Sequence, residues 1–544
     1  MKVDIPDGFW QLESNENPHP ISPMAESFFL EALTAGARHL FAEIGILAET
    51  AEWRAIGGWV YVQTVPFAGD EEALAERLGR TQDAVTADLA GRYLQRWEHE
   101  WRPWLLRRRE ELGSVELSAL DDGALDEHLA ETVGFLFAAT DVHMLLHASN
   151  ALMLGEFAFA CRELLGWSEQ QVFEVLSGLS LASTEPAQRL AELADAARSR
   201  PAVRVLLDDP RSAVAKLEAA DPEFEAAFRR SLADFGDRAV RYEVVDPTIG
   251  ECPELLLQLL RDQITRPYDP EAVAGRLASR QAETRAAARA ALAEQHPGER
   301  ERFDRLLARA ERFYPVREDN EVWTQSVPLA LVRRALLEVG RRLTAAGTIG
   351  EAGDVFFLAL PEARQALVQG GHLTGLVAGR RAERTWAAAH PGPASYGPPP
   401  DPPDLSGLPP AAALVHETVG WVIDRILASD ANSQRQAGPL IEGIAASSGR
   451  YTGPARVVLT EDELGKVQPG DVLVCPATSP AWSPVFASIG ALVTDTGGIL
   501  SHAAIIAREF AIPTVVATGN ATELFSDGQP ITVDGDAGQV GAVR

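Results

Sequence analysis

The stretch Ala491–Arg508, ALVTDTGGILSHAAIIAR, joins a strand to a helix through a glycine-rich turn. Four β-prone residues, 491–494, lead into the turn, and an apolar-periodic run after it predicts a helix over Ser501–Phe510. Two glycines permit a tight turn and a close approach of the backbone. Ser501 is a good N-cap residue, which places His502 in the first helical turn. The stretch therefore predicts a strand–turn–helix unit with an imidazole at a helix N-terminus.

The position of His502 suits a phosphoryl carrier. Free backbone N–H groups and the positive end of the helix dipole face whatever lies beside the imidazole. The dipole disfavours the imidazolium ion and leaves a neutral ring nitrogen to act as a nucleophile. A phosphoryl group on His502 could be held by these N–H groups and by the Thr496 hydroxyl. A buried histidine that closes a strand-to-helix turn is the alternative, and spacing alone leaves both open.

Around this turn, from about Gly443 to the C-terminus, short β-prone runs alternate with glycine turns. This alternation of β-prone runs and turns, together with the helix that begins at Ser501, predicts a small α/β domain over residues 443–544. The predicted strands are Ala455–Leu459, Asp471–Cys475, Ala491–Thr494, Pro513–Ala517 and Ile531–Asp534.

Residues 1–390 are predicted to be mostly helical, because apolar residues recur there at three- and four-residue spacing. One exception is Trp53–Phe67, where a Gly-Gly turn between two β-prone runs predicts a hairpin.

Nine of the twenty residues in Pro391–Pro410 are proline, which predicts an extended, stiff spacer. A short helix is expected after it, over Ala411–Ala428. The expected architecture is a multidomain protein with a helical module at 1–390, a linker at 391–442 and the C-terminal α/β domain.

The composition excludes several classes of protein. A chain of 544 residues with 49 basic and 78 acidic side chains carries a net charge of −29, which opposes binding to nucleic acid or to an anionic membrane. No apolar run reaches the length that a membrane helix needs, and no signal segment opens the chain. Three widely spaced cysteines argue against a disulfide framework. We expect a cytoplasmic protein.

Lysine is rare in this chain. Only Lys2, Lys216 and Lys466 occur, and none lies in a glycine-rich loop. Nucleotide sites commonly place a lysine ammonium on the phosphates. We therefore expect no ATP site and no cofactor in this chain.

Four C-terminal motifs carry a specific resemblance: GRYTGPARVV (449–458), GDVLVCPATSPAW (470–482), TDTGGILSHAAIIAREFAIPTVV (494–516) and DGQPITVDGDAGQV (527–540). They closely resemble the swivelling phosphohistidine domain of the phosphoenolpyruvate-utilising enzymes. The resemblance implies that His502 takes a phosphoryl group from a donor and passes it to an acceptor. It also implies a phosphate-binding surface, whose candidate residues are Thr496, Gly497, Gly498, Ser501 and Arg508. For Arg508, which matches the motif arginine, a structural ion pair remains the alternative.

Upstream segments resemble the branch that contains rifampicin phosphotransferase and phenylphosphate synthase. FWQL (9–12) and NPHPISPM (17–24) are similar to the opening of its acceptor-binding module, and Arg317-Glu318 follows in the same order. The resemblance implies that Arg317 contacts the transferring phosphoryl group. The family usually has a lysine four residues later, so that two cations hold the phosphoryl group. This chain has Glu321 at that position, so we expect Arg317 to be the single cation there. An ordinary ion pair is the alternative for Arg317.

His143 and His147 are spaced to share one helix face. They are candidates to activate the acceptor hydroxyl. Ordinary helix packing and a zinc pair are alternatives, but a zinc site needs a third ligand and no HExxH pattern is present. No metal site is predicted.

The expected arrangement is an acceptor-binding module, a spacer and a mobile domain that carries His502. A separate chain is expected to phosphorylate this histidine. This resembles the split phenylphosphate synthase and 4-methylphenyl phosphate synthase. By that resemblance an ATP-grasp partner subunit binds ATP and Mg²⁺, and the phosphoryl group on His502 passes to a phenolic acceptor, giving aryl phosphate, AMP and phosphate. Two alternatives remain: a component of an antibiotic phosphotransferase, and a non-catalytic phosphohistidine carrier that relays phosphate between proteins.

Overall fold

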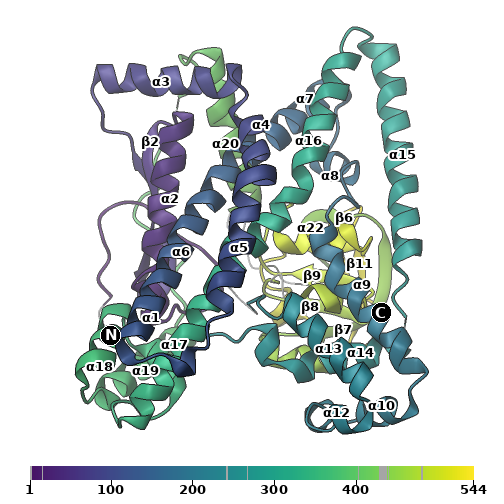
Figure 1. Cartoon of the computed structure of the whole chain (residues 1–544). Coiled ribbons are helices and arrows are strands. Elements are labelled where there is room, and N and C mark those ends of the chain that lie inside the picture. The colour runs from purple at the N-terminus through teal and green to yellow at the C-terminus, as the bar shows by residue number, and fades with distance from the viewer. Residues whose placement is uncertain are drawn as a thin grey trace. The chain divides into compact units, whose positions relative to one another are not determined.

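The computed structural model describes residues 3–14, 16–239, 243–265, 267–401, 404–427, 436, 438, 440–478 and 482–543 (Figure 1). The chain forms two compact units, and each draws on separate parts of the sequence. Unit 1 contains Met1–Leu152, Arg241–Asp246 and Asn320–Gly420, and unit 2 contains Met153–Val240, Pro247–Asp319 and Trp421–Arg544. The predicted layout of a helical protein with a C-terminal α/β domain is confirmed. The units group the chain differently from the three predicted consecutive segments, because helices from residues 153–319 pack with the C-terminal sheet.

Unit 1 is built on helices α2, α6 and α17. Its helices are α1 (Pro23–Glu26), α2 (Phe29–Ile44), α3 (Glu71–Thr86), α4 (Leu89–Arg96), α5 (Arg102–Gly113), α6 (Asp122–Ser149), α17 (Val327–Ala345), α18 (Leu360–Gln369), α19 (Thr374–Ala389) and the first part of α20 (Pro410–Leu427). Three π-helical turns adjoin them: η1 (Trp97–Trp101), η3 (Asn150–Gly155) and η5 (Val322–Ser326). Helix α6 packs between α2 and α17 (Figure 1). Gly36 permits the close approach of α2, because a Cβ there would lie 2.8 Å from Met144 Cγ.

A four-stranded antiparallel sheet completes unit 1. The predicted hairpin is confirmed as β2 (Ala48–Ile56) paired with β3 (Trp59–Pro66), and β1 (Trp10–Leu12) and β4 (Ser395–Tyr396) extend the sheet. Trp59 and Tyr61 are buried in one apolar cluster with Trp10, so the hairpin aromatics belong to the core.

The first residues of the predicted proline spacer are part of this sheet. Strand β4 pairs with β1, and the Leu12 N–H donates to the Ala394 carbonyl at 2.9 Å. The Tyr61 hydroxyl donates to the Pro393 carbonyl at 2.8 Å. Residues 393–396 are therefore held on unit 1 as an edge strand, while 402 and 403 lie outside the described residues.

Unit 2 contains an eight-stranded sheet in the order β5-β12-β11-β7-β8-β9-β10-β6, in which β7, β8, β9 and β10 are parallel. The strands are β5 (Leu440–Glu442), β6 (Ile444–Ser447), β7 (Arg450–Val457), β8 (Val472–Cys475), β9 (Ala491–Thr494), β10 (Thr514–Val516), β11 (Pro530–Asp534) and β12 (Gln539–Ala542). The longer helices are α7 (Glu156–Leu165), α9 (Leu181–Arg198), α13 (Pro222–Phe235), α14 (Pro253–Thr265), α15 (Pro270–Gln295), α16 (Arg300–Glu321, to residue 319 in this unit) and α22 (His502–Glu509). The five predicted strands and the predicted helix after the turn are confirmed.

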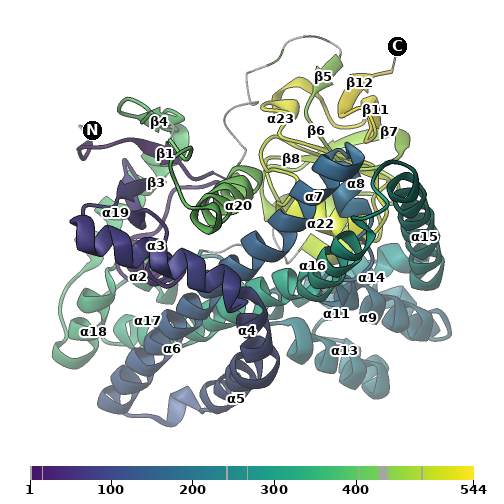
Figure 2. The same cartoon turned by 90° about the horizontal axis from the view of Figure 1, so that it is seen from above.

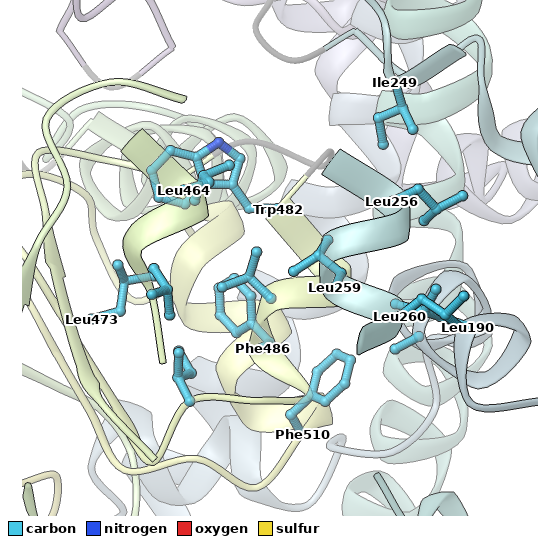
Figure 3. Close-up of a cluster of buried hydrophobic side chains, with 14 of the residues drawn as sticks. Leu190, Ile249, Leu256, Leu259, Leu260, Leu464, Leu473, Trp482, Phe486 and Phe510 are labelled. Carbon is cyan, nitrogen blue, oxygen red and sulfur yellow. The ribbon is translucent and has the colours of Figure 1, made fainter. Parts of the chain in front are cut away.

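One apolar core joins the helical and sheet parts of unit 2. Leu190 of α9 and Leu256, Leu259 and Leu260 of α14 lie in the same buried cluster as side chains of the C-terminal domain, among them Trp482, Phe486 and Phe510 (Figure 3). Helix α22 contacts α9 as well as β6 and β10, and in the view of Figure 2 it lies between α9 and the C-terminal strands. Burial of these side chains fixes helical residues 181–265 on the sheet domain.

The helix that runs through α6, η3 and α7, Asp122–Leu165, is long and apolar enough to cross a membrane by length and composition alone. No such segment was predicted from the sequence. In the structure 61% of the most apolar window is buried inside the protein, as in a core helix.

His416 ties α20 to the start of β2. Its Nδ1 lies 2.8 Å from the Ala412 carbonyl, and its Nε2 accepts from the Leu47 N–H at 2.9 Å. This pairing requires the neutral ring, and burial lowers the pKa of His416 below its usual value of 6.5. The neutral form therefore contributes stability in full above about pH 6.5, and this contribution is lost as the pH falls through the lowered pKa.

We expect the urea midpoint of unfolding to fall between pH 7.5 and pH 5 more steeply for the natural chain than for His416→Gln. The glutamine carbonyl can still accept from Leu47 but does not titrate. Identical pH profiles for the two chains would show that His416 does not contribute.

Candidate active site

The glycine turn lies at the carboxyl end of β9, a central parallel strand, where open α/β sheets commonly bind ligands. Gly497 has a φ of +99°, a region that residues with a Cβ rarely adopt. The Ser501 hydroxyl accepts from the Ala504 N–H at 3.4 Å, so Ser501 is the N-cap of α22 as predicted. His502 is the first residue of that helix.

The His502 ring faces Glu318 of α16. Its Nδ1 lies 2.9 Å from Glu318 Oε2, and the side chains are 13% and 5% exposed. The pair is in ion-pair range, although the ring N–H is poorly aligned for a hydrogen bond. His502 Nε2 is buried and has no hydrogen-bond partner among the described residues. The ring therefore presents one nitrogen to a carboxylate and keeps the other available.

The charge of Glu318 is set by opposing influences. Burial is the largest and works to raise the pKa of this carboxyl. The attraction of His502 and the positive charges of Arg317 and Arg238 together outweigh burial, and they hold the pKa of Glu318 below its usual range. Glu318 is therefore a carboxylate at neutral pH, opposite the histidine.

Arg317 contacts the turn rather than the imidazole itself. Its Nη2 donates to the carbonyl of Leu500, two residues before His502, and its Nε is buried without a hydrogen-bond partner in the described part of the chain. The side chain is 8% exposed. Arg317 thus places a buried cation beside the N-terminus of α22.

Thr496 lies in the turn, but its hydroxyl is engaged elsewhere. It donates to the Pro476 carbonyl at 3.0 Å, and the Thr496 N–H contacts the same oxygen at 3.0 Å. Thr496 therefore fixes the turn to the end of β8, and its hydroxyl must rotate before it can donate to a phosphoryl oxygen.

Arg508 and Glu509 at the other end of α22 anchor the helix. Arg508 is 2% exposed, donates to the Ala446 carbonyl at 3.0 Å and lies over the Phe173 ring. The Glu509 carboxyl accepts from the N–H groups of Gly178 and Ser180 at 3.0 and 3.1 Å. Burial, only partly offset by these bonds, raises the pKa of Glu509 to about 8. In this structure Arg508 contacts a backbone carbonyl and an aromatic ring, and its role in phosphate binding stays a prediction.

His143 and His147 lie in unit 1 and contact each other. Their Nε2 atoms are 3.3 Å apart, and His143 Nδ1 lies 3.1 Å from Thr324 Oγ1. The Thr324 hydroxyl donates to Asn320, so it accepts from His143 Nδ1–H, and His147 Nε2–H then donates to His143 Nε2.

Unit 2 thus brings Arg317, Ser501 and His502 together at one turn, while Arg508 packs at the far end of α22. Glu318 as the partner of His502 and Arg238 as a nearby positive charge were not predicted from the sequence. The adjacent pair Arg317-Glu318 on a predicted helix was the available signal. In the described part of the chain no group of three or more His, Cys, Asp or Glu side chains is placed to hold a metal ion.

Two protein-family models match the chain. Residues 467–538 match the mobile domain of PEP-utilising enzymes, and residues 144–318 match the fourth domain of rifampicin phosphotransferase. The first match contains His502, and the second ends at Glu318. The expected resemblance to the PEP-utilising enzymes and to rifampicin phosphotransferase is confirmed.

Similar proteins carry related names. An uncharacterized phosphotransferase of Bacillus subtilis, YvkC, is 28% identical over 99% of this chain and 62% of its own length. A rifampicin phosphotransferase of Streptomyces is 29% identical over 67% of this chain and 40% of its own length. A phosphoenolpyruvate synthase of Pseudomonas aeruginosa is 50% identical over 18% of this chain and 13% of its own length. The chain therefore spans less than two thirds of each of these relatives.

Proposed function

We propose that this chain, which carries the mobile domain of the phosphoenolpyruvate-utilising enzymes, is a phosphotransferase that carries a phosphoryl group on His502 to the hydroxyl of a small acceptor. The observation that carries the proposal is the pairing of His502 Nδ1 with the Glu318 carboxylate, 2.9 Å away, while Nε2 has no protein partner among the described residues. A carboxylate at Nδ1 favours the tautomer with its proton there, so the lone pair of Nε2 is the nucleophile.

The transfer has two in-line steps. In the first, a bond forms between Nε2 and phosphorus while the bond from phosphorus to the donor oxygen breaks. The resulting ring carries a positive charge, which the Glu318 carboxylate stabilises. In the second, the acceptor oxygen attacks phosphorus, the bond from nitrogen to phosphorus breaks, and the hydroxyl proton passes to a base. Arg317 and the N–H groups at the start of α22 support the phosphoryl oxygens.

The donor site belongs to a partner subunit in this proposal. Lys466 is paired with Glu463 at 3.2 Å, and Lys216 lies at the start of a short helix, so neither described lysine belongs to a phosphate-binding loop. In this proposal an ATP-grasp chain that binds ATP and Mg²⁺ phosphorylates His502, and ATP and water are converted into AMP, phosphate and the phosphoryl group on His502. We expect calorimetry to detect no micromolar ATP binding to the isolated chain.

The acceptor is proposed to be phenolic, with His147 as the base that receives its proton. His147 contacts His143, which contacts Thr324, so the two histidines belong to one polar chain in unit 1. The phosphorylated aromatic product would enter catabolism in the cytoplasm. This part of the proposal rests on the resemblance to the split phenylphosphate synthases.

An antibiotic acceptor is the second candidate. It is favoured by the match of residues 144–318 to the fourth domain of rifampicin phosphotransferase. A panel that contains both phenols and rifampicin separates the two.

The test is mass spectrometry of the chain and its small-molecule products after incubation with ATP, with and without a separately purified ATP-grasp protein as the donor partner. We expect an acid-labile phosphate on the chain only when the partner is present, and a phosphorylated acceptor when a phenol is added. A chain that becomes phosphorylated but never passes the phosphate to a small molecule would be a relay between proteins instead.

A further inference from the structure

One buried carboxyl group in unit 2 joins the C-terminal α/β domain to the helices that precede it in the chain. The Glu509 side chain, in the last turn of α22, is buried and accepts from the N–H groups of Gly178 and Ser180 at 3.0 and 3.1 Å. These two residues lie in the loop between α8 (Glu169–Glu174) and α9. Glu509 therefore connects the C-terminal domain to the helical part of the same unit.

The backbone of the loop is shaped for this contact. Gly178 has a φ of +84°, a region that residues with a Cβ rarely adopt, and a Cβ there would lie 3.3 Å from Leu277 Cβ. Two backbone donors thus converge on one carboxyl group, and their direction depends on the loop conformation that this glycine permits.

The same helix presents His502 at its other end. His502 and Glu509 are seven residues apart, so they lie two turns apart on one face of α22. The contact at Glu509 therefore fixes the helix in the position that places His502 Nδ1 2.9 Å from Glu318 Oε2. His502 Nε2 is buried in this docked arrangement. A donor reaches Nε2 only after the domain leaves the helices, so the contact at Glu509 has to break and form again in each cycle.

The protonation of Glu509 changes the strength of docking. Burial raises the pKa of Glu509 to about 8. The ionisable groups that face it are Arg508 on the same helix, Glu318 and Tyr314 from α16, and Tyr268. None of them changes charge between pH 6 and pH 8, because the pKa of Glu318 is lowered and burial raises the pKa of both tyrosines to about 12. A carboxyl group in water has a pKa of about 4.3, so the docked state binds the proton more tightly and docking weakens as the pH rises toward 8.

We propose that Glu509 is a positioning residue that acts as a latch: it holds the C-terminal domain on the loop between α8 and α9 with His502 against Glu318, and its release exposes Nε2 to the phosphoryl donor. The inference rests on the proposed function and adds a control of docking to it. Uptake of a proton by Glu509 closes the latch, and loss of the proton opens it.

Phosphoramidate, a small phosphoryl donor that needs no enzyme, tests the latch in the full chain. Its phosphorus–nitrogen bond breaks as the bond from phosphorus to His502 Nε2 forms, and ammonia leaves. Because Nε2 is buried in the docked arrangement, the rate at which acid-labile phosphate appears on His502 measures the released fraction. The amide of Glu509→Gln accepts from one N–H and turns its NH₂ toward the other. We expect this variant to react at least tenfold faster at pH 7.

The pH profile distinguishes a latch from a merely structural carboxyl group. The titration of His502 itself is common to both chains and cancels when the rate of the natural chain is divided by that of Glu509→Gln. This ratio should rise with pH between pH 6 and pH 8, by up to tenfold per unit, and level off above pH 8.

A second variant acts from the other side of the contact, and a third is the matched control. Gly178→Ala forces the loop out of its conformation without touching the C-terminal domain, so it should also speed the reaction with phosphoramidate. Asp471 is 2% exposed and accepts from the Gln468 N–H at 2.8 Å, but both residues lie within the C-terminal domain. Asp471→Asn should change the rate less than twofold.

Equal rates in the natural chain, Glu509→Gln and Gly178→Ala would overturn the inference. So would a rate ratio that does not change with pH, or an equal acceleration by Asp471→Asn. If the phosphoryl group on His502 still reaches an acceptor in that case, the proposed function stands. A latch that responds as expected, in a chain that no donor partner phosphorylates, would overturn the proposed function instead.

Discussion

His502→Ala is expected to abolish phosphoryl transfer completely while the chain folds normally. The imidazole is the only nucleophile at the start of α22 in the proposal, and no water or neighbouring side chain replaces a covalent carrier. Folding should persist because Ser501 still caps the helix and alanine is the best helix former. Circular dichroism and the melting temperature measure the fold, and acid-labile phosphate on the intact chain measures the charging of the histidine.

Ser501→Ala separates the loss of the carrier from damage to the turn. It removes the cap but leaves the nucleophile, so we expect a stability loss of about 1 kcal/mol with phosphorylation still detectable. Acid-labile phosphate that persists on His502→Ala would place the carrier on another residue.

Glu318→Gln should slow the transfer about 10²- to 10⁴-fold, which makes it the second largest expected effect. The amide is close in size to the carboxylate, but it cannot neutralise the positive charge of a phosphorylated ring. It can also turn its NH₂ toward Nδ1, which would select the tautomer that blocks Nε2. The effect is measured with a radiolabelled donor, as the separate rates at which His502 gains the phosphoryl group and passes it on.

Glu311→Gln is the matched control for this change. Glu311 lies on the same helix, α16, and pairs with Arg285 at 2.6 Å. A substitution there removes a half-buried charge pair of the same helix without touching His502. Equal losses of rate in the two variants would mean that Glu318 acts only through the stability of α16.

Local structure at the turn could be predicted from the sequence because it depends on neighbouring residues. The Ser501 cap, the glycine turn and α22 follow from residue types at short spacing, and each appears as expected. The partner of His502 could not be predicted in this way. Glu318 lies far from it in the chain, and helix periodicity does not tell which side chains of α16 meet α22.

Side-chain direction was also beyond the sequence. The residue type and position of Thr496 make its hydroxyl a candidate hydrogen-bond donor to a phosphoryl oxygen. In the structure this hydroxyl donates to the carbonyl of Pro476, which directly follows strand β8. The proline content of 391–410 predicts an extended backbone, and Ser395–Tyr396 form strand β4, but its pairing with β1 could not be predicted, because β1 lies near the other end of the chain. Both outcomes depend on tertiary neighbours that local patterns do not specify.

The central claim is that the phosphoryl group resides on Nε2 of His502 while Nδ1 faces Glu318. Phosphorus–nitrogen correlation NMR of the intact chain, charged by its donor partner and labelled with ¹⁵N in histidine, tests this directly. The account predicts one phosphohistidine, at residue 502, with phosphorus bonded to Nε2. Phosphorus bonded to Nδ1, or to any other residue, would contradict it.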